Sequence, residues 1–495
     1  MSLKRNIIAN LLGRSYAMAS VYLFVPFYVA ILGIDRYGVV AFYAILLTVA
    51  GLADVGLSAT LSREAAREPD RARLRDLLAT MERALLGTAF VFAVIVFLSA
   101  DLIARRWLNT DALGASETAA SLRLMALMIA PQIGISLYTA GLLGLERQAG
   151  ANVIQAAFVT IRGGLVIPLI HFQPSLMLFF GWQLGVTVIF FVVARVALLR
   201  GMGFSGLTSG RASLTVLRPV MGFAGGMFAI TVLAAINTQM DKVLVSKIFS
   251  ISEFGYYSLA STLAQLPAAV VAPLLVAMLP RVTRMVAAGD EDAASELFAR
   301  FSRLVAALSG VGAVGLIAFA PEVLTLWLGA DHVLPETVVV LRILALGGLF
   351  LAIGSTPFYF GLAYGHNRTS ILIGFSTLVV AVPLLIVGSS RLGLTGAAWP
   401  WVLINLSSFV MLTAIVTRRY FRGSLTRLQL ASTAYPILVC LVTMSIARWA
   451  ASTIDAGPFF GCVIAAIAGL VALAISGWAE VRTVLLSRFP ALRRS

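Results

Sequence analysis

Charged residues are scarce in this chain of 495 residues: they make up 12% of it, whereas 60% of its residues are hydrophobic. A soluble protein carries roughly 25% charged residues. The mean hydropathy is +0.96, and apolar runs long enough to cross a bilayer as a helix, about 20 residues each, recur from end to end. The shortage of charge excludes a soluble protein. The apolar runs are continuous rather than alternating, which excludes a membrane β-barrel.

Cysteine and histidine are also rare, with two and three residues. Cys440 and Cys462 lie in apolar runs without ligand spacing, so we expect both to be small buried hydrophobic residues. The sequence has no glycine-rich phosphate loop, no metal-ligand cluster and no nucleophile–base motif. It therefore predicts no catalytic residue, no metal, no cofactor and no enzyme.

The apolar runs predict an all-α integral membrane protein with about fourteen transmembrane helices, since unpaired backbone groups are not tolerated in lipid. The predicted spans are 7–33, 38–60, 81–104, 121–145, 150–171, 175–197, 219–248, 254–280, 304–328, 337–360, 369–389, 395–417, 430–452 and 457–478.

The basic residues predict the orientation of these spans. With the N-terminus in the cytoplasm, 26 of the 37 lysines and arginines fall in cytoplasmic segments and six in outer segments. This bias follows the positive-inside rule and places the N- and C-termini in the cytoplasm. The net charge of +15 is thereby explained by topology, and no nucleic acid partner is expected.

A weak internal repeat has an offset of 217 residues. The segment 31–47, "ILGIDRYGVVAFYAILL", aligns with 248–264, "IFSISEFGYYSLASTLA", so that Gly38 matches Gly255. Six predicted spans separate the copies, so both have the same orientation, as in parallel repeats around a membrane-normal axis. The expected domains are an N-terminal six-helix lobe (1–200), a cytoplasmic linker (201–218), a C-terminal six-helix lobe (219–417), and helices 13 and 14 with a basic tail (430–495).

Cations inside the spans are the main functional candidates, because ionisable groups in lipid are costly. Arg162 lies near the middle of its span and is either a cavity residue or a partner for a carboxylate. Arg14 lies closer to a span end, where a long side chain can instead reach the interface. With Lys242 and the polar residues Asn237 and Gln155, they form the predicted substrate-binding set. A basic cavity suits an anionic substrate, since arginine and lysine bind phosphate well.

Two acidic residues are the candidates for a coupling-ion site. Asp54 lies past the middle of the second predicted span and either pairs with a cation, accepts a proton, or caps a break at Gly51 or Gly56. Asp241 shares a helix face with Asn237, four residues earlier. This polar stripe faces either a cavity between the lobes or the membrane interface.

The opening "LGIDRYGVVAFYAILLTVAGLADVGLSATLSREAAR" and its counterpart "NTQMDKVLVSKIFSISEFGYYSLASTL" resemble the polysaccharide exporters of the multidrug/oligosaccharidyl-lipid/polysaccharide (MOP) flippase superfamily. Within it, the chain resembles the Wzx-type O-antigen and exopolysaccharide repeat-unit flippases, over essentially its whole length. The shared motifs are an "LG…YG" turn, a "D.GL….R" helix end and an "N…D" pair in span seven.

The resemblance implies a multi-pass protein of the bacterial inner membrane. It implies that the chain flips an undecaprenyl-pyrophosphate-linked oligosaccharide by alternating access, with membrane lipids and other polysaccharide-assembly proteins as partners. The alternatives are a cation-coupled drug exporter of the same superfamily, a MurJ-type lipid II flippase, and, in a different class, a membrane polysaccharide polymerase or glycosyltransferase. The basic span interior argues against a pump for cationic drugs.

Overall fold

The computed structural model describes residues 3–54, 56–68, 70–110, 113–204, 210–211, 221–365, 367–420 and 425–488. Within the helices, that description leaves out the side chains of 3–15, 17–18, 221–231, 233–234, 367–371, 419–420, 425–431 and 478–488. The described residues form helices and no strands, with one isolated bridge between Asn109 and Ser250. Contacts divide the chain into two compact units, Met1–Gly255 and Tyr256–Ser495.

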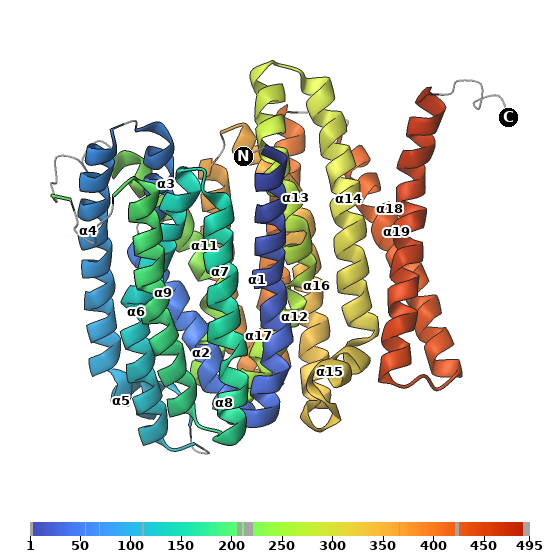
Figure 1. Ribbon diagram of the computed structural model, residues 1–495. Coiled ribbons are helices and arrows are strands. Elements are labelled where there is room, and N and C mark those ends of the chain that lie inside the picture. Colours follow the sequence, from blue (N-terminus) through green and yellow to red (C-terminus); the bar gives the residue numbers. More distant parts are fainter. Residues whose placement is uncertain are drawn as a thin grey trace. The chain divides into compact units, whose positions relative to one another are not determined.

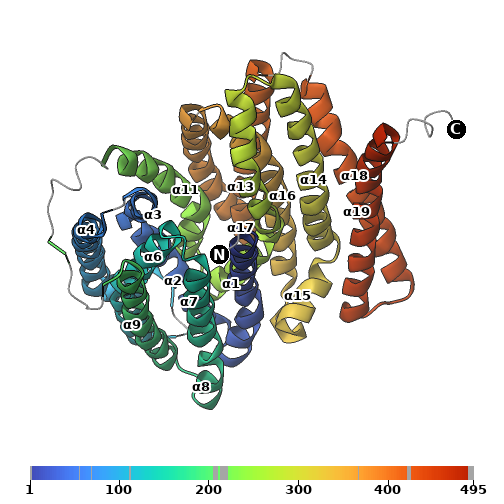
Figure 2. The same ribbon diagram turned by 45° about the horizontal axis from the view of Figure 1, so that its top comes forward.

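In the first unit, α6 packs against α3, α4 and α9, and α2 packs against α1, α6 and α11 (Figures 1 and 2). Its elements are α1 (Leu3–Leu32), α2 (Ile34–Gly51), η1 (Leu52–Asp54), α3 (Leu57–Arg67), α4 (Arg71–Leu98), α5 (Ala100–Leu102), η2 (Ile103–Trp107), α6 (Ala115–Gly144), α7 (Gln148–Val159), η3 (Thr160–Gly164), α8 (Val166–Phe172), α9 (Leu176–Gly201), α11 (Met221–Ile248) and the start of α12 (Ile251–Ala264).

In the second unit, α16 packs against α13, α14 and α17, while α18 and α19 pack against α14. Gly393 (φ 61°, ψ −143°) divides α17 into two helices, at the junction predicted between the spans 369–389 and 395–417. The elements after α12 are α13 (Leu266–Ala287), α14 (Glu291–Ala318), α15 (Ala320–Leu328), η5 (Ala330–His332), α16 (Pro335–Ala363), α17 (Asn367–Tyr420), α18 (Leu425–Thr453) and α19 (Pro458–Arg488).

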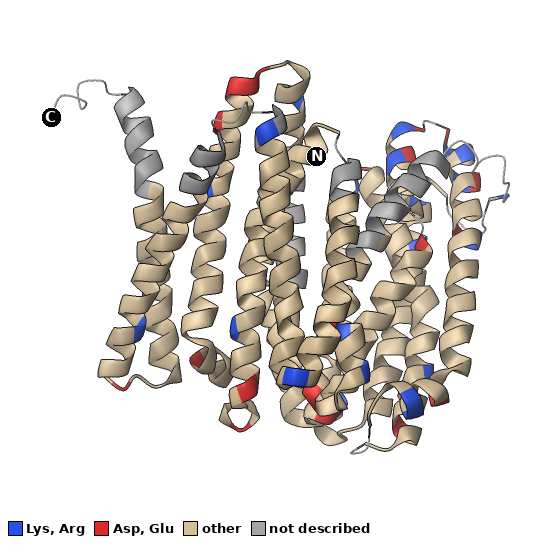
Figure 3. Ribbon diagram, turned by 180° about the vertical axis from the view of Figure 1, so that it is seen from behind, with Lys and Arg blue, Asp and Glu red and all other residues tan. Residues whose placement is uncertain are grey.

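Length and composition make this a multi-pass membrane protein. Within the described residues, 11 helices are long and apolar enough to span a membrane. Figure 3 shows that the charged residues of the described part of the chain lie mostly towards the helix ends, so the middle of these helices is largely uncharged. This is the distribution expected of spanning helices. The predicted total of fourteen spans, the cytoplasmic termini and the lobe boundaries remain predictions.

The C-terminal helices are fixed to the second unit by an apolar cluster and an ion pair. Cys440 on α18 is fully buried, with its thiol 3.9 Å from the carbonyl oxygen of Ala307 on α14. Arg448 on α18 pairs with Glu322 on α15. The predicted burial of Cys440 is therefore confirmed, while Cys462 is only half-buried.

The structure reproduces the 217-residue offset at a helix start: α2 begins at Ile34 and α12 begins at Ile251. The first turns of α2 and α12 pack against each other, and each places a glycine against the first residue of the other helix. A Cβ on Gly38 would collide with the carbonyl oxygen of Ile251, and a Cβ on Gly255 would lie 3.0 Å from the carbonyl oxygen of Ile34. Glycine at both matched positions allows this close approach of backbones.

Further along, the two copies differ. The predicted continuous helix over 38–60 is wrong, because α2 and η1 end at Asp54 and α3 begins at Leu57 after Gly56, whose φ is +75°. The residue 217 positions later is Pro273, which lies inside α13. Proline is restricted to φ near −65°, so the second copy cannot form the left-handed break of the first. It breaks earlier, at Gln265.

Candidate functional site

Arg162 lies in a π-helix in the middle of a membrane-spanning segment. Helices α7 and α8 form one span, Gln148–Phe172, and η3 (Thr160–Gly164) joins them. At 1.5 Å per residue, Arg162 is about 20 Å from the start of the span and about 15 Å from its end. A π-helix inside a span is rare and frequently marks a functional site. Sequence reasoning identified Arg162 by its depth but did not predict the π-helix.

The π-helix is stabilised by neighbouring side chains that hydrogen-bond its carbonyl oxygens. Tyr28 on α1 donates to the carbonyl of Gly163 (2.6 Å), and Trp182 on α9 donates to the carbonyl of Ile161 (3.0 Å). Gly163 also allows the ring of Phe24 to pack directly against the backbone, 2.9 Å from where a Cβ would be. In a membrane, backbone groups that lose their regular hydrogen-bond partner within the helix need another partner.

The guanidinium of Arg162 is surrounded by neutral groups. Its Cζ lies 5.4 Å from the ring centroid of Tyr43 on α2 and 5.4 Å from that of Phe158 on α7. Its Nη1 donates to Oε1 of Gln132 on α6 (3.3 Å). Within the described residues Arg162 forms no salt bridge, and its buried Nε has no hydrogen-bond acceptor. The predicted alternative of a carboxylate partner thus finds no support among these residues.

This arrangement holds a cation in the membrane without neutralising it. A guanidinium has five N–H donors, and aromatic rings stabilise its charge without consuming those donors. Such a group can bind an anion, and phosphate suits its planar, forked geometry. We call Arg162, Gln132, Tyr43 and Phe158 the Arg162 site.

The other predicted binding residues are placed separately. Gln155 is half-buried on α7. Arg14 is in α1, but its side chain lies outside the described residues. Asn237 and Lys242 are half-buried on α11, and Asp241 is 5% exposed there. Helix α11 packs against α2, η1 and α3. The described contacts do not bring any of these residues to Arg162, so their roles in binding and coupling remain predictions.

Asp54 ends η1 and caps the next helix. Its Oδ1 accepts hydrogen bonds from the backbone N–H of Ser58 (2.9 Å) and from the Ser58 hydroxyl (3.0 Å). Gly56, in the left-handed region, separates the two helices. Of the three roles considered for Asp54, this geometry matches the cap at Gly56, because a carboxylate is among the best acceptors for unpaired N–H groups at a helix start.

A buried ion pair in the first unit was missed from the sequence. Arg195 on α9 donates from Nε to Oε1 of Glu82 on α4 (2.6 Å) and from Nη2 to Oε2 (3.3 Å), and Tyr138 on α6 donates to the same Oε1. Arg195 is one of the 26 basic residues that the positive-inside rule assigns to cytoplasmic segments. The available signal was Glu82, an acidic residue at the start of the predicted span 81–104.

Two further in-span arginines have local partners. Arg123 on α6 pairs with Asp101 on α5, and its side chain is partly exposed. Arg342 on α16 donates from Nε to the carbonyl oxygen of Ile317 (3.1 Å), in the last turn of α14. A cation favours the negative end of a helix dipole. Both arginines lie within a turn or two of the outer end of a predicted span, 121–145 or 337–360, where an interfacial role is expected.

Comparison with known sequences decides the family. Residues 30–333 match the family described as "Polysaccharide biosynthesis protein". The chain belongs to this family. The match covers the Arg162 site and the start of α12, and it agrees with the resemblance to proteins of polysaccharide export. A "Putative O-antigen transporter" of Shigella flexneri is 22% identical over 428 residues, which are 84% of this chain and 98% of that protein.

Solved structures give the fold of this polysaccharide biosynthesis protein. "Lipid II flippase MurJ, inward closed conformation" superposes with a TM-score of 0.71 at 13% identity, covering 96% of this chain and 99% of that one. A multidrug resistance MATE family transporter of the MOP superfamily, in an inward-facing conformation, gives a TM-score of 0.63 at 15% identity, covering 84% and 99%. The fold is thus a transporter fold, and the named relatives are transporters and flippases rather than enzymes.

Proposed function

We propose that this protein flips an undecaprenyl-pyrophosphate-linked oligosaccharide repeat unit from the cytoplasmic to the periplasmic leaflet of the bacterial inner membrane. It does so by alternating access between two six-helix lobes, 1–200 and 219–417, within fourteen spans that leave both termini in the cytoplasm. The flipped unit then enters exopolysaccharide or O-antigen synthesis. Family membership, the transporter fold and the O-antigen transporter relative support this proposal.

The Arg162 site is the observation that carries the proposal. A pyrophosphate linking a lipid to a sugar carries negative charge and cannot cross the apolar interior unaided. Arg162 offers a cation with unused donors at mid-membrane depth, held by Gln132 and two aromatic rings. A pump for cationic drugs needs the opposite charge, since a cation buried beside Arg162 would be repelled.

The proposal is tested by deleting the gene in the native host and locating the lipid-linked glycan. A glycan-directed probe is applied to intact spheroplasts and to opened membranes. The flippase function predicts a glycan that accumulates and becomes reachable only after opening. A normal amount of glycan, reachable outside, contradicts it, and a simultaneous rise in sensitivity to cationic dyes would instead indicate a drug exporter.

Complementation then tests the site. Arg162→Ala should fail to restore outward glycan, because the anion loses its cation, and Arg162→Lys should restore part of it. Arg342→Ala is the matched control: it also removes an in-span arginine, but one that donates to a backbone carbonyl. Expression of each variant is measured in the same membranes. If Arg162→Ala and Arg342→Ala reduced the amount of outward glycan equally, a specific role for Arg162 would be contradicted.

A further inference from the structure

A second basic site lies where α4 and α5 end and α6 begins. A cavity of about 570 Å³ opens there, between η2, the following turn, the start of α6 and the end of α11. Small-molecule sites typically measure about 300–1,000 Å³. Its charged lining residues are Arg105, Arg106 and Lys247. All three are cations, and they come from two segments far apart in the sequence.

The wall of this cavity is held in place by contacts between those two segments. Trp107 donates from Nε1 to the hydroxyl of Ser246 (3.2 Å), and Lys247 donates to the carbonyl of Arg106 while lying 5.7 Å from the centroid of the Trp107 ring. The backbone N–H of Ile251 donates to the carbonyl of Asn109 (3.0 Å). The cations are therefore presented by a preorganised wall rather than by free loops.

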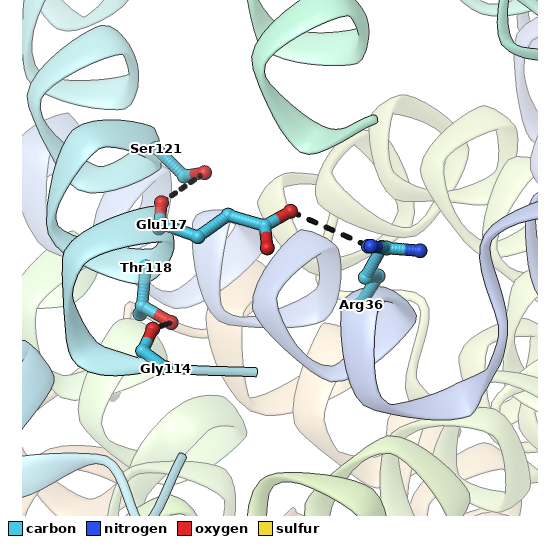
Figure 4. Close-up of polar contacts among 5 residues, drawn as sticks. All are labelled: Arg36, Gly114, Glu117, Thr118 and Ser121. Carbon is cyan, nitrogen blue, oxygen red and sulfur yellow. Dashed lines mark hydrogen bonds and ion pairs between the residues drawn. The ribbon is translucent and has the colours of Figure 1, made fainter. Parts of the chain in front are cut away.

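Two described acidic residues near the cavity, Asp101 and Glu117, are engaged elsewhere. Asp101 pairs with Arg123, and Glu117 pairs with Arg36 (3.3 Å). Figure 4 shows that the Glu117 side chain extends from the first turn of α6 to Arg36 on α2, while Gly114 lies at the start of the helix. Among the described residues, Arg105 and Arg106 form no ion pair and both are exposed. Among the lining residues that the structure describes, no carboxylate offsets this positive charge.

The start of α6 adds backbone donors to these cations. Gly114 and Ala115 line the cavity. Gly114 precedes a helix of 30 residues, with φ of 79° and no side-chain cap. The first N–H groups of a helix have no partner within the helix, and its N-terminus favours anions. Three side-chain cations and these N–H groups therefore converge on one cavity.

We propose that this cavity binds the phosphate group of a membrane lipid. The phosphate oxygens accept hydrogen bonds from Arg105, Arg106 and the first turn of α6, and Lys247 adds positive charge beside the Trp107 ring. Tryptophan and basic side chains at helix ends are typical of the membrane–water interface, which is the depth of lipid headgroups. The site is separate from Arg162 and does not require that the protein be a flippase.

Two lipids carry the required chemistry: an anionic phospholipid, and a polyprenyl pyrophosphate such as the proposed substrate bears. Binding is measured on the purified full-length protein by native mass spectrometry and by tryptophan fluorescence. The probes are phosphatidylglycerol and farnesyl pyrophosphate, with phosphatidylcholine and inorganic pyrophosphate as comparisons. The test variant is Arg105→Gln with Arg106→Gln. Arg123→Gln is the matched control, an exposed arginine nearby that is paired with Asp101.

We expect the double variant to weaken binding of at least one lipid probe by 10-fold or more, and Arg123→Gln to change it less than 2-fold. Arg105→Lys with Arg106→Lys should restore part of the affinity, which shows that the fold is intact. Loss for phosphatidylglycerol identifies the phospholipid as the ligand, and loss for farnesyl pyrophosphate alone identifies the polyprenyl pyrophosphate. Equal binding by the wild type and the double variant, or equal weakening in Arg123→Gln, overturns the proposal.

The result is independent of the flippase assay. Arg162→Ala should leave binding of phosphatidylglycerol unchanged while abolishing glycan transfer. Failure of the cavity proposal therefore leaves the proposed function standing. Failure of the proposed function likewise leaves a lipid site that can be measured on the purified protein.

Discussion

Glu82 and Arg195 form a two-point ion pair in the first helical unit, with side chains that are 10% and 14% exposed. The pair joins α4 to α9, and Tyr138 extends it to α6. A charge left behind when one partner of a buried pair is removed typically costs about 3–5 kcal/mol. The pair is therefore expected to be a structural requirement of this unit.

Glu82→Ala should lower the free energy of unfolding by about 3 kcal/mol, because it strands the Arg195 guanidinium in a poorly hydrated site. The measurement is thermal unfolding of the purified protein in detergent. The control is Asp101→Ala, which breaks the exposed pair with Arg123 and should cost less than about 1 kcal/mol. Equal shifts in the two variants would show that burial does not govern these pairs.

Gly163→Ala should destabilise the π-helix and reduce transport. The added methyl would lie 2.9 Å from the Phe24 ring and 3.1 Å from the Tyr28 hydroxyl, so both must move and Arg162 would move with them. Gly185→Ala on α9 is the control, since its Cβ meets nothing within 4 Å. That substitution should be neutral or slightly stabilising, because alanine favours helix by about 1 kcal/mol over glycine. Glycan transfer and melting temperature are measured for both.

Gly38→Ala should lower the melting temperature more than Gly255→Ala, although the two glycines occupy matched positions in the repeat. The first methyl collides with the carbonyl oxygen of Ile251, whereas the second lies 3.0 Å from that of Ile34. Gly51→Ala on α2, with open space around it, should have little effect. Melting temperatures of the three variants check the order. If Gly51→Ala were as harmful as Gly38→Ala, helix flexibility rather than close packing would explain the result.

Asp54→Asn should retain transport within about 2-fold, whereas Asp54→Ala should lose stability by about 1 kcal/mol. Asparagine also caps helix starts well, and alanine does not. The measurement combines glycan transfer with thermal unfolding. This comparison separates the cap from a coupling role: a carboxylate that must take up a proton cannot be replaced by an amide, so inactivity of a stable Asp54→Asn would favour coupling.

Much of the architecture follows from apolar run length and the repeat. Runs of about 20 apolar residues predict spanning helices because lipid enforces them. The 217-residue offset of the repeat recurs in the helix starts at Ile34 and Ile251, although the predicted spans began at 38 and 254. The π-helix at Arg162 was not predictable, because "TIRGG" contains no pattern that separates it from an ordinary helix. It depends on hydrogen bonds from Tyr28 and Trp182, which lie on other helices.

For the Arg162 site, the sequence predicted the arginine but not the residues that surround it. The depth of a charged residue in the membrane can be estimated from its distance along the sequence to both ends of its span, and this distance identified Arg162. Its partners Gln132 and Tyr43 are neutral and lie on different helices, so nothing in the sequence links them to it. The Glu82–Arg195 pair was missed because both residues lie near the predicted ends of their spans, where charge is expected.

Gly56 and Pro273 occupy matched positions in the repeat but allow different backbone conformations. Two matching segments can have the same backbone only while the residues at matched positions allow the same conformation. Proline at 273 excludes the left-handed conformation that glycine adopts at 56. A graft of the segment 52–57 into the second copy would therefore change its chain direction and not only its side chains. The two segments match in position, but neither could replace the other without a change of backbone.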